Sequence, residues 1–94
     1  MPRPRMRKRI GFKPNYNQFG PKGVPNIDFV TLTLEEHETI RLIDKEGMSQ
    51  EECGKSMEVA RTTVQKIYSE ARKKIAEAIV DGKTLIIEGE DYLK

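Results

Sequence analysis

The stretch "SMEVARTTVQKIYSEARKKI", residues 56–75, determines how the rest of the chain is interpreted. Its apolar residues Val64, Ile67 and Ala71 are spaced by three and four, as on one face of a helix. A helix-turn-helix template laid over residues 50–69 finds an apolar or small residue at every buried position. The sequence therefore predicts a helix-turn-helix whose second helix begins near Ala60.

Two residues in this stretch depart from the template. Glu58 stands where such turns usually place glycine, and Ala60 stands where the helix usually gains a serine cap. A left-handed conformation at a non-glycine residue costs on the order of 1 kcal/mol. A missing N-cap costs roughly another 1 kcal/mol. We therefore expect a less stable motif, and an acid at Glu58 that repels phosphate beside the outward-facing residues.

Two capping boxes define the helices that precede this stretch. They are "TLEE" at residues 33–36 and "SQEE" at residues 49–52, each with a hydroxyl cap and a glutamate three residues later. Gly47 can adopt positive φ and is expected to end the first helix. The second helix is expected to bury Cys53 and Met57.

Composition divides the chain into three regions. Residues 1–32 contain all five prolines, which excludes a long helix there. This basic arm and loop is expected to hold a short strand in "KRIGFK" and to anchor itself to the core through Tyr16 and Phe19. Residues 33–82 form the helix-turn-helix domain. Residues 83–94 form a C-terminal strand and tail.

The third helix is predicted to end at Asp81-Gly82, and Ile75, Ala78 and Ile79 continue its apolar period. A β-branched segment, Thr84–Glu88, follows it and is expected to pair with residues 8–12. The fold class expected is mainly α: a tri-helical helix-turn-helix of the winged-helix or homeodomain-like class, with short N- and C-terminal β segments.

Charge is distributed unevenly along this chain of 94 residues, although its formal net charge is only +2. The first nine residues and residues 61–74 are basic, whereas residues 33–58 are acidic. Such a polarised surface steers polyanions. The single cysteine excludes an intrachain disulfide, and no apolar run approaches the roughly 20 residues of a membrane span. We therefore expect a cytoplasmic protein without a membrane partner.

The outward residues at the start of the third helix suit DNA. Arginine can bond to guanine and glutamine to adenine, and a threonine methyl can contact thymine. The candidates for base contact are Arg61, Thr62, Gln65, Lys66 and Ser69. The candidates for phosphate contact are Arg72, Lys73, Lys74, Arg3, Arg5, Arg7, Lys8 and Arg9. The alternatives are a solvated helix face, charge that favours the helix C-terminus, and a solubilising tail.

Two resemblances extend this interpretation. Residues 33–79, from "TLEEHETIRL" to "ARKKIAEAI", resemble region four of bacterial sigma factors, with His37 where a leucine is common. The start "MPRPRMRKRIGF" and the end "GKTLIIEGEDY" are similar to a family of small, uncharacterised prokaryotic proteins described as predicted DNA-binding proteins. The resemblance implies a sigma-region-four-like fold and transcriptional regulation, with no known operator or ligand.

The residue types present give little indication of catalysis or metal binding. His37 and Cys53 are too few for a structural zinc site, and there is no glycine-rich phosphate loop. The carboxylates are assigned to capping boxes and solvent-facing helix positions. We therefore predict no enzyme activity, no cofactor and no metal.

The function expected is sequence-specific binding of double-stranded DNA by a transcriptional regulator. It could act as a homodimer through Ile75 and Ile79 of the long third helix or through the terminal strands. One alternative is a sigma-like protein-interaction module that contacts RNA polymerase through its acidic first two helices. Another is RNA binding through the basic arm.

Overall fold

Both capping boxes form in the computed structural model, which describes residues 11, 14, 16–25 and 28–88. The Thr33 hydroxyl accepts from the Glu36 amide at 3.1 Å, and the Glu36 carboxylate accepts from the Thr33 amide at 2.9 Å. This box begins helix α1, Leu34–Thr39. The same pair of bonds between Ser49 and Glu52 begins helix α2, Gln50–Met57. The predicted starts of the first two helices are confirmed.

The first helix continues as a π-helical segment, η1, Ile40–Lys45, where the sequence predicts a regular α-helix. Its wider turn shows in the bond from the Glu46 amide to the Arg41 carbonyl at 2.9 Å. Two hydrophobic clusters meet along this segment. Ile40 packs against the cluster beside the sheet, and Leu42 belongs to the cluster beside α2. Gly47, with φ +83°, ends the segment as predicted.

The long helix α3, Arg61–Asp81, begins and ends where the sequence predicts, with Gly82 at φ 69° after its last residue. Its buried residues Val64, Ala71 and Ala78 recur every seven positions. Seven residues are close to two helical turns, so these side chains form one stripe along the helix. Ile79 continues the apolar period predicted for this helix, and its side chain is 75% exposed.

The sheet has three strands in the order β1-β3-β2. The central strand is β3, Thr84–Glu88, with the predicted bounds. It pairs in parallel with β2, Phe29–Thr33, and antiparallel with β1, Gln18–Phe19. All three helices lie between β2 and β3 in the sequence, which gives this parallel pair the long crossover it requires.

These strands differ from the predicted pairing with residues 8–12. Of those residues the structure describes only Gly11, which is in no strand, and the rest lie outside the described residues. Residues 14–26, "PNYNQFGPKGVPN", are predicted to form an irregular loop, but they contain β1. Tyr16 is 73% exposed, so its predicted anchoring to the core is wrong. Phe19 is 51% exposed and faces the same side of the sheet as its pairing partner Leu85.

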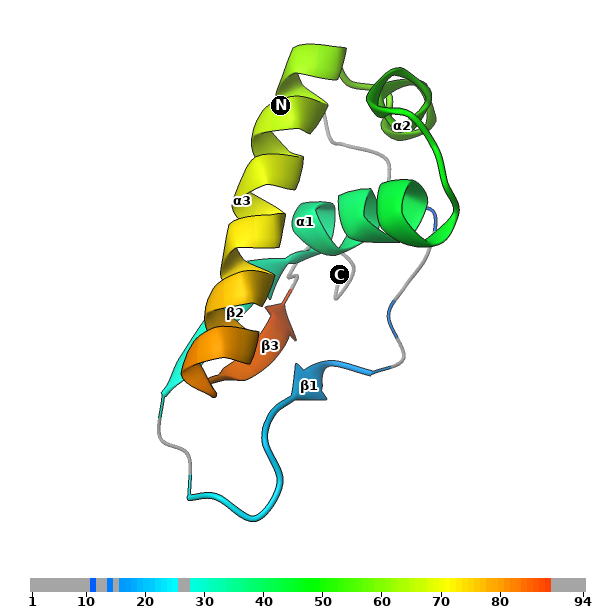
Figure 1. Cartoon of the computed structure of the whole chain (residues 1–94). Helices are drawn as coiled ribbons and strands as arrows, with labels where there is room; N and C mark the ends of the chain where they lie inside the picture. The colour runs from blue at the N-terminus through cyan, green and yellow to red at the C-terminus, as the bar shows by residue number, and fades with distance from the viewer. Residues whose placement is uncertain (1–10, 12–13, 15, 26–27, 89–94) are drawn as a thin grey trace, which may run out of the picture.

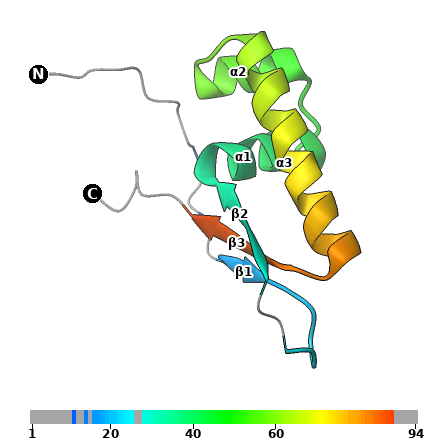
Figure 2. The same cartoon turned by 90° about the vertical axis from the view of Figure 1, so that its left-hand side faces the viewer.

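The helix α3 joins the two parts of the molecule. Figure 1 shows α2 beside its N-terminal end and the sheet beside its C-terminal half. One cluster contains Leu32, Leu34, Ala71 and Ile87, and the other contains Leu42, Cys53, Met57 and Val64. Figure 2 shows the helices gathered on one side of the sheet. Within the described residues, every helix is too short or too polar to cross a bilayer.

Candidate nucleic-acid interface

The turn between α2 and α3 depends on a close backbone approach. Glu58 adopts the left-handed conformation, φ 62° and ψ 44°, as the template requires of this position. The Val59 amide then bonds to the Gly54 carbonyl at 2.9 Å, and the Val59 side chain packs against the cluster beside α2. A Cβ on Gly54 would lie 2.8 Å from the Val59 carbonyl oxygen. Gly54 therefore allows the turn to fold back onto α2.

The helix α3 begins at Ala60 without a side-chain cap. The Ala60 carbonyl accepts from the amides of Thr63 and Val64, at 3.0 and 3.1 Å. The amides of the first helical turn cannot bond to carbonyls within their own helix, and an alanine cap offers them no oxygen. Ala60, Arg61 and Thr62 are all exposed, so the start of α3 faces solvent.

The five candidates for base contact all lie on the exposed side of α3. Thr62, Gln65 and Ser69 follow one another at steps of three and four along this side. Arg61 and Lys66 flank them and are also exposed. The structure therefore brings together the set that the sequence selected on the solvent-exposed part of α3, beside its buried stripe.

Arg72 is held by groups from two elements. Its Nη1 donates to the Tyr68 hydroxyl at 2.8 Å, and that hydroxyl donates to Oδ1 of Asp44 in η1 at 2.7 Å. The guanidinium carbon lies 5.5 Å from the centroid of the Tyr68 ring, and Nη1 lies 3.7 Å from Asp44 Oδ1. The hydrogen bond to Tyr68, followed by the charge of Asp44, raises the pKa of Arg72. Arg72 remains exposed, but its orientation is set.

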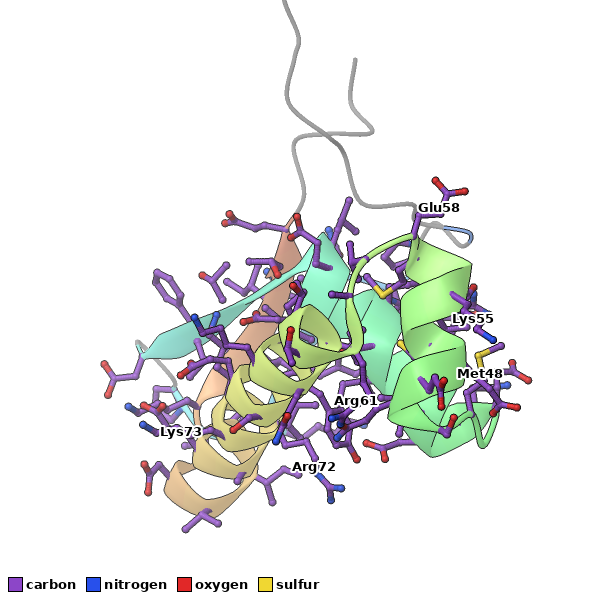
Figure 3. The ribbon with its side chains drawn as sticks, turned by 90° about the horizontal axis from the view of Figure 1, so that it is seen from above. Met48, Lys55, Glu58, Arg61, Arg72 and Lys73 are labelled. Carbon is purple, nitrogen blue, oxygen red and sulfur yellow. The ribbon has the colours of Figure 1, made fainter. Side chains whose placement is uncertain are left out.

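The two lysines after Arg72 have different surroundings. Lys73 is exposed, and Figure 3 shows it pointing to a different side of α3 from Arg72. Lys74 is half-buried and forms an ion pair with Glu36 at 2.8 Å. The same Glu36 oxygen accepts from the Thr33 amide, so Lys74 joins α3 to the start of α1. Arg72 and Lys73 are thus more accessible to phosphate than Lys74.

A buried carboxylate, Glu38, was assigned to a solvent-facing helix position, and this assignment is wrong. Glu38 is 1% exposed, and its two oxygens accept from Arg41 Nε at 3.1 Å and Nη2 at 3.0 Å. The Gly11 amide also donates to Glu38, at 3.0 Å. The spacing of Glu38 and Arg41 by three residues was the only sequence signal for this pair. The hydrogen bond that Arg41 donates to Glu38 raises the pKa of Arg41.

The bond from Gly11 to Glu38 fixes the point at which the basic arm joins the helices. The arm's candidates for phosphate contact precede that point and lie outside the described residues: Arg3, Arg5, Arg7, Lys8 and Arg9. A bidentate arginine–carboxylate pair has a fixed geometry. Gly11 is therefore held against the first helix by a carboxylate that Arg41 keeps in place.

Glu58 lies away from the candidate face. Figure 3 shows its side chain projecting from the turn on the opposite side from Arg61 and Arg72. The sequence predicts that Glu58 repels phosphate because it places this acid beside the outward-facing residues. The turn instead directs the Glu58 side chain away from Arg61 and Arg72. We therefore expect Glu58 to affect stability through its backbone more than binding through its charge.

The remaining reactive side chains are enclosed by the fold. Cys53 is buried, and desolvation raises the pKa of its thiol, which disfavours the reactive thiolate. Desolvation lowers the pKa of His37, against a smaller raising effect of Glu38. In the part of the chain that the structure describes, no three His, Cys, Asp or Glu side chains are grouped as metal ligands would be.

Comparisons with known proteins place the chain in a family. A family model described as "Protein of unknown function DUF134" matches residues 1–94. The chain is 55% identical to a UPF0251 protein of Desulfitobacterium hafniense, over 98% of this chain and 75% of the relative. It is 50% identical to a UPF0251 protein of Caldicellulosiruptor bescii, over 99% of this chain and 66% of the relative. No solved structure matches the chain at a significant level. The chain belongs to the DUF134 (UPF0251) family of prokaryotic proteins.

Proposed function

We propose that this protein binds double-stranded DNA in a sequence-specific manner and regulates transcription in the cytoplasm. The helices α2 and α3 with their short turn form a helix-turn-helix similar to that of sigma region four, and the N-terminal part of α3 enters the major groove. One observation carries the proposal: the five candidates for base contact are all exposed on one side of the start of α3. The cluster beneath them holds this helix against α2.

The side chains on this face have distinct roles. Arg61 and Gln65 lie about one turn apart and can each form a bidentate pair with a base edge, which reads sequence. Thr62 offers a methyl group to thymine. Arg72, one to two turns beyond Gln65, is oriented by Tyr68 and Asp44 and contacts phosphate, which sets position and affinity without reading sequence.

The basic arm supplies further phosphate or minor-groove contacts. Arg3 lies eight residues before Gly11, whose amide is held by Glu38. An extended chain of eight residues spans about 26–29 Å. That reach is enough to extend from the first helix to a neighbouring groove, as basic N-terminal arms do.

The alternative in which acidic helices contact RNA polymerase is less well supported by the side-chain contacts. Glu38 is buried against Arg41, and Glu36 is buried and paired with Lys74. This alternative depends on three acids of α1, which are Glu35, Glu36 and Glu38, and two of them are therefore engaged inside the protein. RNA binding by the arm alone remains a distinct alternative, which deletion of residues 2–9 separates from the proposal.

The test is selection of bound duplexes from a random DNA pool at a stated salt concentration, because phosphate-driven affinity falls steeply with salt. We expect one enriched site. Arg61→Ala with Gln65→Ala should then lose discrimination against changed bases, by about 1–3 kcal/mol for each lost pair. Arg72→Ala should weaken all duplexes alike and reduce the salt slope by about 1.

Lys45→Ala is the matched control, because Lys45 is an exposed cation on η1 outside the candidate face. It should leave the selected site and its affinity unchanged. The proposal is refuted if no site is enriched, or if the Arg61 and Gln65 variant selects the same site as the unchanged protein. Loss of all affinity on deleting residues 2–9, with the double variant unaffected, would establish binding by the arm instead.

A further inference from the structure

An apolar groove of about 390 Å³ lies between the C-terminal half of α3 and β1. Ile75, Ile79, Phe19 and Leu85 line it, together with glycine, proline and alanine, and none of its lining residues is charged. Ile79 is 75% exposed and Phe19 is 51% exposed at its rim. Apolar side chains exposed together in a chain that is 34% charged indicate an interaction surface.

We propose that this surface binds the same surface of a second copy of the chain, with the two α3 helices antiparallel and crossing near residue 77. The role of this dimer rests on the proposed function: it identifies a second copy of the chain as the partner with which the protein binds DNA. A two-fold interface uses one patch twice, so the patch must fit itself. Here the exposed Ile79 of one copy can enter the groove beside Ile75 of the other, and the reverse contact follows by symmetry.

The absence of charge in the groove lining favours this partner over a charged one. Burying an unpaired charge costs several kcal/mol, and this groove would bury none. The other large exposed aliphatic residue on this part of α3, Val80, lies outside the groove lining and is 80% exposed. Val80 follows Ile79 directly, so the two side chains diverge by roughly 100° around the helix.

The length of α3 between the groove and the base-contact residues supports a second copy of the chain as the partner. Residue 65, the middle of the base-contact set, lies twelve residues before residue 77, or about 18 Å along the helix. Two such helices, antiparallel, about 8–10 Å apart and crossing at about 20–50°, hold their base-contact centres about 34–37 Å apart. Half-sites on one face of B-DNA are about 34–36 Å apart. The crossing point therefore separates the two base-contact segments by one turn of DNA.

The direction of the groove leaves the base-contact residues free. Around α3, the mean direction of Ile75 and Ile79 differs by roughly 90° from that of Thr62, Gln65 and Ser69. A two-fold axis that relates antiparallel helices lies perpendicular to the line joining them. Both base-contact faces would thus point to the same side of the pair, where one duplex can meet them.

The first experiment measures mass by sedimentation equilibrium at micromolar protein, without DNA. We expect twice the 10.8 kDa of the single chain for the unchanged protein. Ile79→Glu should reduce the mass to that of one chain, whereas the matched Val80→Glu should leave the dimer intact. Both positions are highly exposed, so each variant should fold with an unchanged circular dichroism spectrum. A single-chain mass for the unchanged protein, or equal dissociation by both variants, overturns the proposal.

The second experiment tests the arrangement. A nitroxide on Gln65→Cys, measured by pulsed electron paramagnetic resonance, should report a separation of about 34–37 Å between backbones, broadened by the label. Cys53 is fully buried and should not take the label. A separation of about 10–18 Å would indicate parallel helices with the same crossing point and overturn the antiparallel pairing. These measurements need no DNA, so a dimer that selects no duplex would refute only the proposed function, and a monomer that selects a site would refute only this inference.

Discussion

Glu58 offers the sharpest test of the turn between α2 and α3. It is the only non-glycine residue with positive φ in the described part of the chain. The left-handed conformation costs an L-residue about 1–2 kcal/mol, which glycine does not pay. Glycine also makes the unfolded chain more flexible, which offsets about 0.4–1 kcal/mol of that gain. We therefore expect Glu58→Gly to raise the free energy of unfolding by about 0.5–1 kcal/mol.

In a domain of this size, that gain corresponds to an increase in Tm of about 2–8 °C. The measurement is thermal and urea unfolding followed by far-ultraviolet circular dichroism. The matched control is Gly47→Ala, at φ +83°, where no atom lies within 4 Å of the added Cβ. It isolates the backbone cost and should lower Tm.

Affinity for a selected duplex should be unchanged in Glu58→Gly, because Glu58 projects away from Arg61 and Arg72. The reasoning is refuted if Glu58→Gly lowers Tm while Gly47→Ala also lowers it. That result would mean that contacts of the Glu58 side chain outweigh the strain of its backbone.

Three further changes test the surroundings of the turn and the first helix. Ala60→Ser should add the missing N-cap of α3 and raise the free energy of unfolding by about 1 kcal/mol in urea titrations; no gain would show that solvent already satisfies the first-turn amides. Gly54→Ala should lower the free energy of unfolding by on the order of 1–2 kcal/mol, although alanine has the better helix propensity. The reason is that the alanine Cβ would lie 2.8 Å from the Val59 carbonyl oxygen. A more stable variant would contradict that contact. Burial lowers the pKa of His37, so the unfolded chain binds its proton first and stability should fall as pH drops below about 6.5. His37→Leu should remove this loss of stability when the free energy of unfolding is measured across the pH range. If the loss is unchanged, another group causes it.

Local signals in the sequence were sufficient for the helix boundaries. A capping box is a contact between residues three apart, and a glycine with positive φ ends a helix whatever lies around it. Thr33, Ser49, Gly47 and Gly82 therefore marked their elements correctly. The candidates for base contact followed from the same period, since residues between the buried positions of α3 must face outward.

The strands depended on contacts between distant residues. Residues 29–33 pair with residues 84–88 across more than fifty positions, and no local pattern specifies such a partner. The two-residue strand β1 exists only because the edge of β3 is available to it. For the same reason, the sequence predicts that residues 8–12 pair with β3, whereas the N-terminal segment that pairs with it is β1.

Burial of charge was likewise decided by the tertiary structure. Glu38 reads as an exposed helix position, yet Arg41 and Gly11 enclose its carboxylate, and Lys74 reaches Glu36 across thirty-eight positions. Ile79 continues the apolar period of α3, yet it is 75% exposed. Sequence alone determined where each helix starts, where it stops and which face of α3 is polar, because those properties arise within a few residues. Only the packing of α3 between α2 and the sheet decided which charges are paired, and it left an apolar groove open to solvent.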